Sequence, residues 1–299
     1  MFYHDGGQLQ YPVRVEKPNP LFAKALQQAI GGIEGEMRVC LQYLFQAWNA
    51  RGPSKYRDML LETGTEEISH IEMLATAVAL NLEGASVSLQ EDAARDPVLE
   101  AALGGQNIRH VLSSGLGAMA VDASGVPFNG SWIVGSGNIA ADMYANVMAE
   151  STGRVLATRL WNMTDDPGMK DMLSFLIARD VMHQNQWLAV LEELGPEQLP
   201  IPNSFPQSEE AGEFSYAFMS TRKDPKPDAF DGSRWVTGRS IDGNGEFSFI
   251  ADMQPLGDVP QLGMADPRTF AQIDQIAPNA SARKRLREEV AGHVHDGDD

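Results

Sequence analysis

The sequence predicts an all-α protein built on a four-helix bundle. Long segments that lack proline carry apolar residues at helical spacing, which is typical of amphipathic helices. Short turn-like segments join these helices in pairs, and a long irregular segment separates the first pair from the second. Two helical hairpins joined by a long crossover form one of the standard plans of four-helix bundles.

The first pair of helices is predicted over residues 21–50 and about 54–82. Residues 21–50 contain no proline, and their apolar positions recur every three to four residues. Arg51-Gly52-Pro53-Ser54 then ends the first helix and caps the second. Because this connection is short, we expect the two helices to be antiparallel neighbours.

The second pair follows a crossover over residues 83–136, where glycine, serine, asparagine and proline are frequent. A short helix is expected near residues 97–112. The third helix is predicted from Gly137 to about residue 165, and the fourth from 169 to 194, ended by a Gly-Pro pair. This order of elements is that of a ferritin-like four-helix bundle with a long crossover.

The two ends of the chain are predicted to lie outside the bundle. The expected organisation is an extended N-terminal arm over residues 1–20, the bundle over 21–195, a wrapping C-terminal tail over 196–280 and a disordered stretch over 281–299. The tail is mostly irregular, but Asp242-Gly243-Asn244-Gly245, flanked by residues 234–240 and 246–251, predicts a small β-hairpin.

Composition excludes several classes of partner. The chain has 41 acidic and 23 basic residues and a formal net charge of −18. Nucleic acid and anionic membranes are therefore not expected partners, since phosphate binding needs clustered Lys and Arg.

There is one cysteine, Cys40, no signal-peptide pattern at the N-terminus, and no apolar run near the roughly 18 residues of a membrane helix. These features predict a cytoplasmic protein.

Acids and histidines recur at the middle of each predicted helix. In the second and fourth helices, an acid precedes a histidine by three residues, so both side chains share one helix face. The first and third helices each carry one glutamate on their apolar side. The residues concerned are Glu36, Glu67, His70, Glu150, Asp180 and His183.

Four buried carboxylates without a counter-ion would be very costly, and two metal ions would remove that cost. One Glu from each of two helices, with Glu-x-x-His from each of the other two, is the pattern of di-iron and di-manganese bundles. Here Asp180 replaces the second Glu of this pattern with a side chain one methylene shorter, so we interpret it as an outer, proton-handling group. The expected metal ligands are Glu36, Glu67, His70, Glu150 and His183. Each histidine then needs an acceptor for its second ring nitrogen, which the sequence does not identify.

Tyr43 lies two turns after Glu36 and on nearly the same helix face. Its phenol could hydrogen-bond a ligand carboxylate or a bridging oxygen. An ordinary interior tyrosine, paired with backbone, is the alternative.

At these residues the chain resembles the manganese catalases. The matching stretches are Gly31-Gly32-Ile33-Glu34-Gly35-Glu36, Thr63 to Met73, Ser136-Gly137-Asn138, Ala141-Asp142-Met143, Ala178-Arg179-Asp180 and His183-Gln184. The resemblance extends over about residues 1–270. Thr63-Gly64-Thr65-Glu66-Glu67 is a specific signature of the family in this context rather than a general feature of helical bundles.

This resemblance implies two manganese ions per subunit, bound by the five ligands named above. It implies that hydrogen peroxide is the substrate, and that the metal pair cycles between two Mn(II) and two Mn(III). Tyr43 corresponds to a tyrosine near the family's cluster, and Asp180 to an outer glutamate that handles protons in some members. The family also implies a homohexamer in which the tail wraps adjacent subunits.

Two positions depart from the family pattern. Some members have an arginine where this chain has Ala149, and its absence suggests a more open or differently wired channel. Some members bind calcium between the second helix and the tail. Asp58 and Glu62 offer carboxylates one turn apart, but Arg222 and Lys223 place cations where neutral ligands are expected, so calcium stays an open alternative.

Two other functions remain open from the residues alone. One is a di-iron oxidase or oxygenase, because carboxylates and imidazoles suit both metals. The other is a coat-type structural protein with a weakly active site. The motifs outside the ligands favour a manganese catalase.

Overall fold

The computed structural model of the 299-residue chain describes residues 7–84, 110, 113–195, 206–221, 232–251, 254–261, 263, 284, 285 and 288. Apart from residue 110, the short helix expected near residues 97–112 lies outside these residues, and so does most of the expected disordered stretch 281–299. The chain divides into two compact units. One contains residues up to 216 together with 237–247, and the other contains 217–236 and 248 onward.

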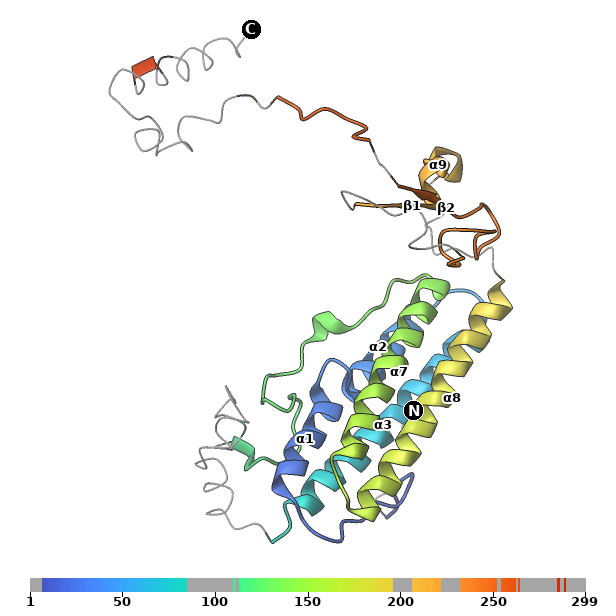
Figure 1. Ribbon diagram of the computed structural model, residues 1–299. Coiled ribbons are helices and arrows are strands. Elements are labelled where there is room, and N and C mark those ends of the chain that lie inside the picture. Colours follow the sequence, from blue (N-terminus) through green and yellow to red (C-terminus); the bar gives the residue numbers. More distant parts are fainter. Residues whose placement is uncertain are drawn as a thin grey trace. The chain divides into compact units, whose positions relative to one another are not determined.

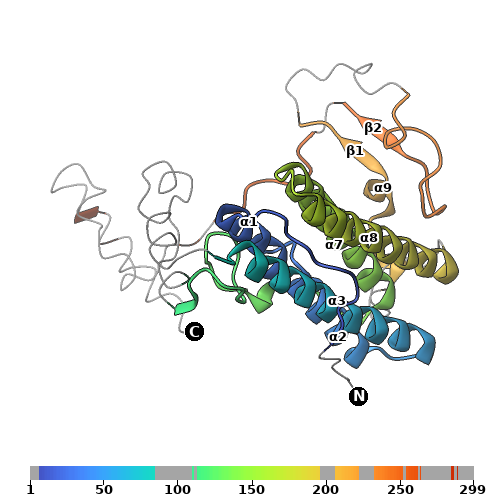
Figure 2. The ribbon, with the colours of Figure 1, turned by 90° about the horizontal axis from the view of Figure 1, so that it is seen from below.

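The first unit contains the predicted bundle (Figure 1). Its helices are α1 (Pro20–Gly31), α2 (Glu36–Asn49), α3 (Ser54–Asn81), α7 (Ile139–Asn162) and α8 (Pro167–Leu194). Helices α2 and α3 pack as one hairpin and α7 and α8 as the other. Seen from a second direction, the helices of the bundle lie side by side (Figure 2). The helical-bundle fold expected from the sequence is therefore confirmed.

The single helix expected over residues 21–50 is wrong, because the chain breaks between α1 and α2. The break follows close backbone contacts. A Cβ on Gly31 would lie 2.3 Å from the carbonyl oxygen of Val121 in the crossover, and one on Gly35 would lie 2.7 Å from the carbonyl oxygen of Ala29. As a result Glu36 is the first residue of α2 rather than a mid-helix residue. A carboxylate is favoured there by the helix dipole.

The interior of the bundle consists of two apolar clusters with a polar zone between them. One cluster joins α1 to the C-terminal half of α3 and the N-terminal half of α8, and includes Met73 and Leu173. The other joins α2 to the N-terminal half of α3 and the C-terminal half of α8, and includes Leu60 and Trp187. On α3 and α8 the predicted site residues lie between these clusters, so the polar zone is shielded from both ends of the bundle.

Buried amides attach the crossover to the bundle. Asn146 of α7 accepts hydrogen bonds from Gln42 (2.8 Å) and Gln46 (2.9 Å) of α2. The same two glutamines bond the backbone of Val134, through its N–H at 3.1 Å and its carbonyl at 2.9 Å. Because buried polar groups need partners, this network specifies how α2, α7 and the crossover pack together.

The predicted tail hairpin is only partly formed. Residues Arg239 and Glu246 make one antiparallel bridge around the Asp242–Gly245 turn. The next residues instead form β2 (Ser248–Ile250), which pairs in parallel with β1 (Ala217–Met219). The remaining short elements are the 3-10 turns η1 (Gly130–Trp132) and η2 (Gln207–Glu209) and the helix α9 (Gly212–Ser215).

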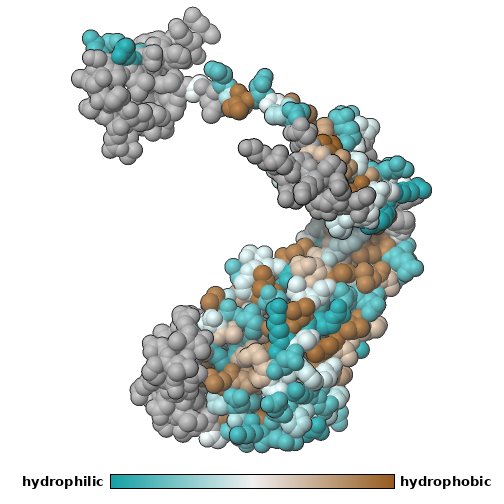
Figure 3. Space-filling model, in the orientation of Figure 1, coloured by the Kyte–Doolittle hydropathy of each residue, from teal (hydrophilic) through white to brown (hydrophobic). Residues whose placement is uncertain are grey.

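Several large apolar side chains remain exposed on the bundle, where hydrophobic and hydrophilic atoms lie next to each other (Figure 3). On α2, α7 and α8 they are Phe45, Trp48, Tyr144, Met148, Val155, Val181, Met182 and Leu188. Among the described residues, none of the helices has the length and apolar character needed to cross a lipid bilayer.

Candidate metal centre

The acids and histidines predicted from the sequence meet at one place, in the polar zone between the two apolar clusters. They project from α2, α3, α7 and α8, with Glu36 at the start of its helix and the others near the middle of theirs. His70 and His183 are at most 1% exposed, Glu67 is 1% exposed and Glu150 is 3% exposed. Only Glu36 retains moderate exposure, with 15% of its side chain accessible.

The possible ligand atoms form two groups that share Glu67. One group is Glu36, Glu67 and His70, and the other is Glu67, Glu150 and His183. Within each group the ligand atoms lie within 4.8 Å of one another. Two adjacent three-residue sets with a common carboxylate have the composition that a pair of divalent ions requires.

Both imidazoles direct the Nδ1 atom toward the carboxylates. Nδ1 of His70 lies 2.6 Å from Oε2 of Glu67, and Nδ1 of His183 lies 2.9 Å from its Oε1. Glu150 and Glu36 are farther, at 3.6 Å from Nδ1 of His183 and 3.9 Å from Nδ1 of His70. The two rings are nearly parallel, with centroids 5.8 Å apart. The sets are therefore arranged around a symmetric pair of Nδ1 donors.

Glu66 is the acceptor for the second ring nitrogen of His183, with Oε2 of its carboxylate 3.1 Å from Nε2. Its other oxygen lies 3.7 Å from Nε2 of His70, which is beyond hydrogen-bond distance, and this Nε2 has no hydrogen-bond partner among the described residues. Arg179 donates to the same carboxylate through Nε (2.7 Å) and Nη2 (3.2 Å). The sequence did contain a signal for this role of Glu66, because Glu66 lies four residues before His70 and residues i and i+4 share a helix face. Glu66 thus faces both imidazoles from the side opposite to Glu67.

Electrostatics oppose leaving this cluster without added positive charge. Burial, followed by the charge of Glu67, raises the pKa of Glu36 well above its usual value. Burial likewise raises the pKa of Glu150. Burial would lower the pKa values of His70 and His183, but the neighbouring carboxylates raise them to about 10 and about 12. Three buried carboxylates therefore attract cations to the space between them.

Buried polar atoms without hydrogen-bond partners also favour a cation at this place. Oε1 of Glu67 and Nδ1 of His183 lie 2.9 Å apart, yet neither has a hydrogen-bond partner among the described residues. Buried polar groups are nearly always satisfied, and such exceptions are often explained by an ion. The donors are carboxylate oxygens and imidazole nitrogens, which suit manganese, iron and related ions. The residues present therefore fit a metal pair.

Tyr43 is fully buried, and its hydroxyl donates a hydrogen bond to Oε1 of Glu150. Its ring packs against Trp187, with centroids 4.9 Å apart. Burial and the charge of Glu150 raise the pKa of this phenol well above its usual value, so it stays a donor. The alternative of a tyrosine paired with backbone does not describe this contact.

Asp180 lies beside the two ligand sets without belonging to either. Its side chain is buried, and burial together with the charges of Glu150 and Glu67 raises its pKa well above the usual value. A Cβ on Gly153 of α7 would lie 3.9 Å from Oδ2 of Asp180. Asp180 is therefore next to the carboxylates and can carry a proton there.

The structure also shows where the residues that depart from the family pattern lie. Ala149 is 1% exposed and packs in the apolar cluster that contains Tyr43. Asp58 and Glu62 are exposed on α3, and Arg57 donates to the Asp58 carboxylate at 2.8 and 3.0 Å. The cationic tail residues Arg222 and Lys223 lie outside the described residues. A calcium site at Asp58 and Glu62 stays a prediction.

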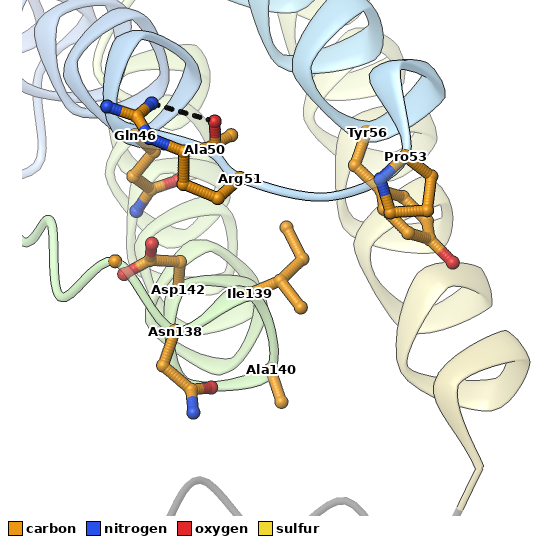
Figure 4. A pocket seen from close by; sticks show the side chains of 10 residues that line it. Gln46, Ala50, Arg51, Pro53, Tyr56, Asn138, Ile139, Ala140 and Asp142 are labelled. Carbon is orange, nitrogen blue, oxygen red and sulfur yellow. Dashed lines mark hydrogen bonds between the residues drawn. The ribbon is translucent and has the colours of Figure 1, made fainter. Parts of the chain in front are cut away.

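A separate cavity of about 210 Å³ lies at the end of the bundle (Figure 4). It is lined by the α2–α3 turn and the first turn of α7, including Arg51, Tyr56 and Asp142. Gln46, one of its lining residues, lies three residues after Tyr43 on α2. None of the five expected ligands contributes to this cavity, so it is distinct from the candidate metal centre.

Comparison with known proteins points to the same chemistry. Residues 1–288 match the family described as manganese-containing catalases. A manganese catalase of Bacillus subtilis is 46% identical over 268 residues, covering 89% of this chain and 96% of that protein. A manganese catalase of Lactiplantibacillus plantarum is 36% identical over 269 residues, covering 90% of this chain and 98% of that protein.

A solved structure supports the fold. The crystal structure of a manganese catalase from Anabaena superposes with a TM-score of 0.65 at 22% identity, covering 85% of this chain and all of the other. The helical bundle, the paired ligand sets and the matches in sequence agree with one another, and the chain belongs to the manganese-containing catalase family.

Proposed function

We propose that this protein is a catalase that converts two molecules of hydrogen peroxide into two of water and one of dioxygen. We assign the metal site to two manganese ions held by Glu36, Glu67, His70, Glu150 and His183. The observation that carries this proposal is the pair of ligand sets that share Glu67. Family membership favours manganese over iron, which the donor atoms alone do not separate.

Bound manganese would supply the redox chemistry, since the pair can take up and return two electrons by alternating between Mn(II) and Mn(III). The protein's part is to position the ligands and to handle protons. Tyr43 donates to Glu150 and so orients that carboxylate from the α2 side. Asp180, buried beside the ligand sets, is suited to accept a proton from peroxide and to return it to the departing oxygen.

The apolar clusters on both sides of the site serve the same chemistry. They exclude bulk water from the ligand carboxylates, which strengthens the attraction of those carboxylates for cations. Access for a small neutral substrate is expected from the side of Glu36, the most exposed of the five ligands. The net charge of −18 does not hinder peroxide, which is uncharged.

Metal analysis and an oxygen-electrode assay test the proposal together. We expect two manganese ions per chain and oxygen release from hydrogen peroxide that haem poisons do not abolish. Glu67→Ala should lose both metal ions and activity, because it removes the shared ligand, whereas the exposed Glu192→Ala on α8 should lose neither. Two irons per chain without oxygen release would contradict the assignment.

We also propose that the protein is a homohexamer in the cytoplasm. The support for assembly is the set of exposed apolar side chains on α7 and α8, since soluble monomers rarely expose large apolar patches. The buried thiol of Cys40 forms no disulfide and is compatible with a reducing compartment. Analytical ultracentrifugation of the purified protein tests the assembly, and a monomer at micromolar concentration would contradict it.

A further inference from the structure

We propose that the N-terminal arm, residues 7–19, is a positioning element of the metal centre that acts on both histidines from outside the bundle. This inference rests on the proposed metal site. It assigns a role to residues that contribute no ligand. The arm runs between α3 and α8 (Figure 2), and it contacts the residues that support the two imidazoles.

The arm is firmly attached at the start of α8. Asp166, the N-cap residue of α8, accepts from the backbone N–H groups of Gly168 and Met169 through Oδ1. Its Oδ2 accepts from the backbone N–H groups of Glu16 (2.8 Å) and Lys17 (3.1 Å) in the arm. One carboxylate therefore caps the helix and fixes the arm at the same time.

A close backbone approach shows how tightly the arm packs there. A Cβ on Gly168 would lie 2.2 Å from the carbonyl oxygen of Arg14, so only glycine allows this contact. Arg14 and Tyr11 then both bond Asp171 one turn further along α8, at 2.9 and 3.0 Å. These contacts fix the register of the arm on α8. They thereby also position Gln10, the residue immediately before Tyr11.

Gln10 reaches the carboxylate that faces both histidines. Its Nε2 donates to Oε1 of Glu66 at 2.7 Å. Glu66 in turn lies 3.1 Å from Nε2 of His183 and 3.7 Å from Nε2 of His70. Arg179 also donates to Glu66, so Gln10 and Arg179 together hold this carboxylate in position. Removal of a group that orients a metal ligand commonly weakens metal binding.

A second contact reaches His70 independently. The ring of Tyr11 stacks on Phe175 of α8, with centroids 4.4 Å apart and an interplanar angle of 12°. Phe175 then meets His70 edge to face, at 6.5 Å and 88°. The arm therefore supports the His70 ring through an aromatic stack and Nε2 of His183 through Glu66.

The rate at which manganese leaves the protein tests this role. We expect Gln10→Ala to raise the rate of manganese loss to a chelator about tenfold, because Glu66 loses a donor that positions it. The matched control is Gln8→Ala, the same substitution on an exposed side chain of the same arm, which should leave the rate unchanged. Both variants are compared as full-length, manganese-loaded protein.

A double-mutant cycle shows whether Gln10 acts through Glu66. In a Glu66→Ala background, Gln10→Ala should add little to the rate of manganese loss, because the group it positions is absent. Equal rates for wild type and Gln10→Ala would overturn the inference. The inference would also be overturned if Gln10→Ala lowered the unfolding free energy of the metal-free protein as much as that of the manganese-loaded protein. The substitution would then destabilise the whole fold rather than the metal centre. Protein that binds no manganese at all would instead refute the proposed function.

Discussion

Oε2 of Glu66 lies 3.1 Å from Nε2 of His183, on the side of the imidazole opposite to Glu67. The ring is thus placed between two adjacent residues of α3. Glu67 faces Nδ1, and Glu66 faces the other ring nitrogen, Nε2. Since the same pair also flanks His70, one dipeptide positions both histidines.

Glu66→Gln should weaken manganese binding by about tenfold to a hundredfold, because a neutral amide is a poorer partner for the two Nε2 atoms than a carboxylate. The measurement is the dissociation constant of manganese from the purified protein. Glu62→Gln, an exposed site on the same helix, is the control. An unchanged constant in the Glu66 variant would show that this carboxylate does not support the ligands.

Tyr43→Phe should lower the turnover number for hydrogen peroxide while leaving both metal ions bound. The variant removes the hydroxyl that donates to Glu150 and keeps the ring that packs on Trp187. Loss of one hydrogen bond to a charged group corresponds to about 1.5–3 kcal/mol. Steady-state oxygen release and metal content are measured together, with the exposed Tyr144→Phe as control. Wild-type turnover would argue against an orienting role for the phenol.

Gly31→Ala should destabilise the protein although alanine is the better helix former. Its Cβ would meet backbone atoms of Val121 at 2.3–2.6 Å, so the crossover must move, at a cost of about 1–3 kcal/mol. Gly153→Ala on α7 is the contrasting variant. Its nearest atoms would be at 3.5 and 3.9 Å, so helix propensity should raise stability by up to about 1 kcal/mol. Urea unfolding measures both, and the same sign for the two variants would contradict the packing argument.

Lys24 should make stability rise between about pH 8 and pH 10.5. Burial lowers the pKa of this lysine from 10.5 to about 8, and its Nζ lies 3.0 Å from Nδ1 of His110. Between these pH values the unfolded chain binds a proton that the folded protein has released, so the free energy of unfolding increases with pH. The difference in unfolding free energy between wild type and Lys24→Met isolates this term, and Lys170→Met serves as control. A difference that does not grow over this range would contradict it.

Much of the bundle could be predicted from local sequence. The segments that became α3, α7 and α8 carry helical periodicity, and turn residues mark their ends, so their existence follows from short-range physics. The spacing of Glu67 and His70 places both on one helix face whatever the surroundings are. The grouping of acids and histidines was predictable for the same reason, because each helix presents its polar site residue on its apolar side.

Other features depended on contacts between distant segments. The break before Glu36 follows from the approach of Val121 to Gly31, which lie 90 residues apart in the chain. The parallel pairing of β1 with β2 replaces most of the predicted hairpin, and it joins residues that lie 31 positions apart in the chain, Ala217 and Ser248.

The sequence by itself therefore determined helices α3, α7 and α8, the residue types of the site and the family, since periodicity, i and i+3 spacing and local motifs are properties of neighbouring residues. Only the tertiary structure decided which oxygen faces which nitrogen. Glu66 and Glu67 are identical in type and adjacent, yet one faces the Nδ1 atoms and the other the Nε2 atoms. That difference arises from the packing of α8 and the arm on α3, which no local pattern encodes.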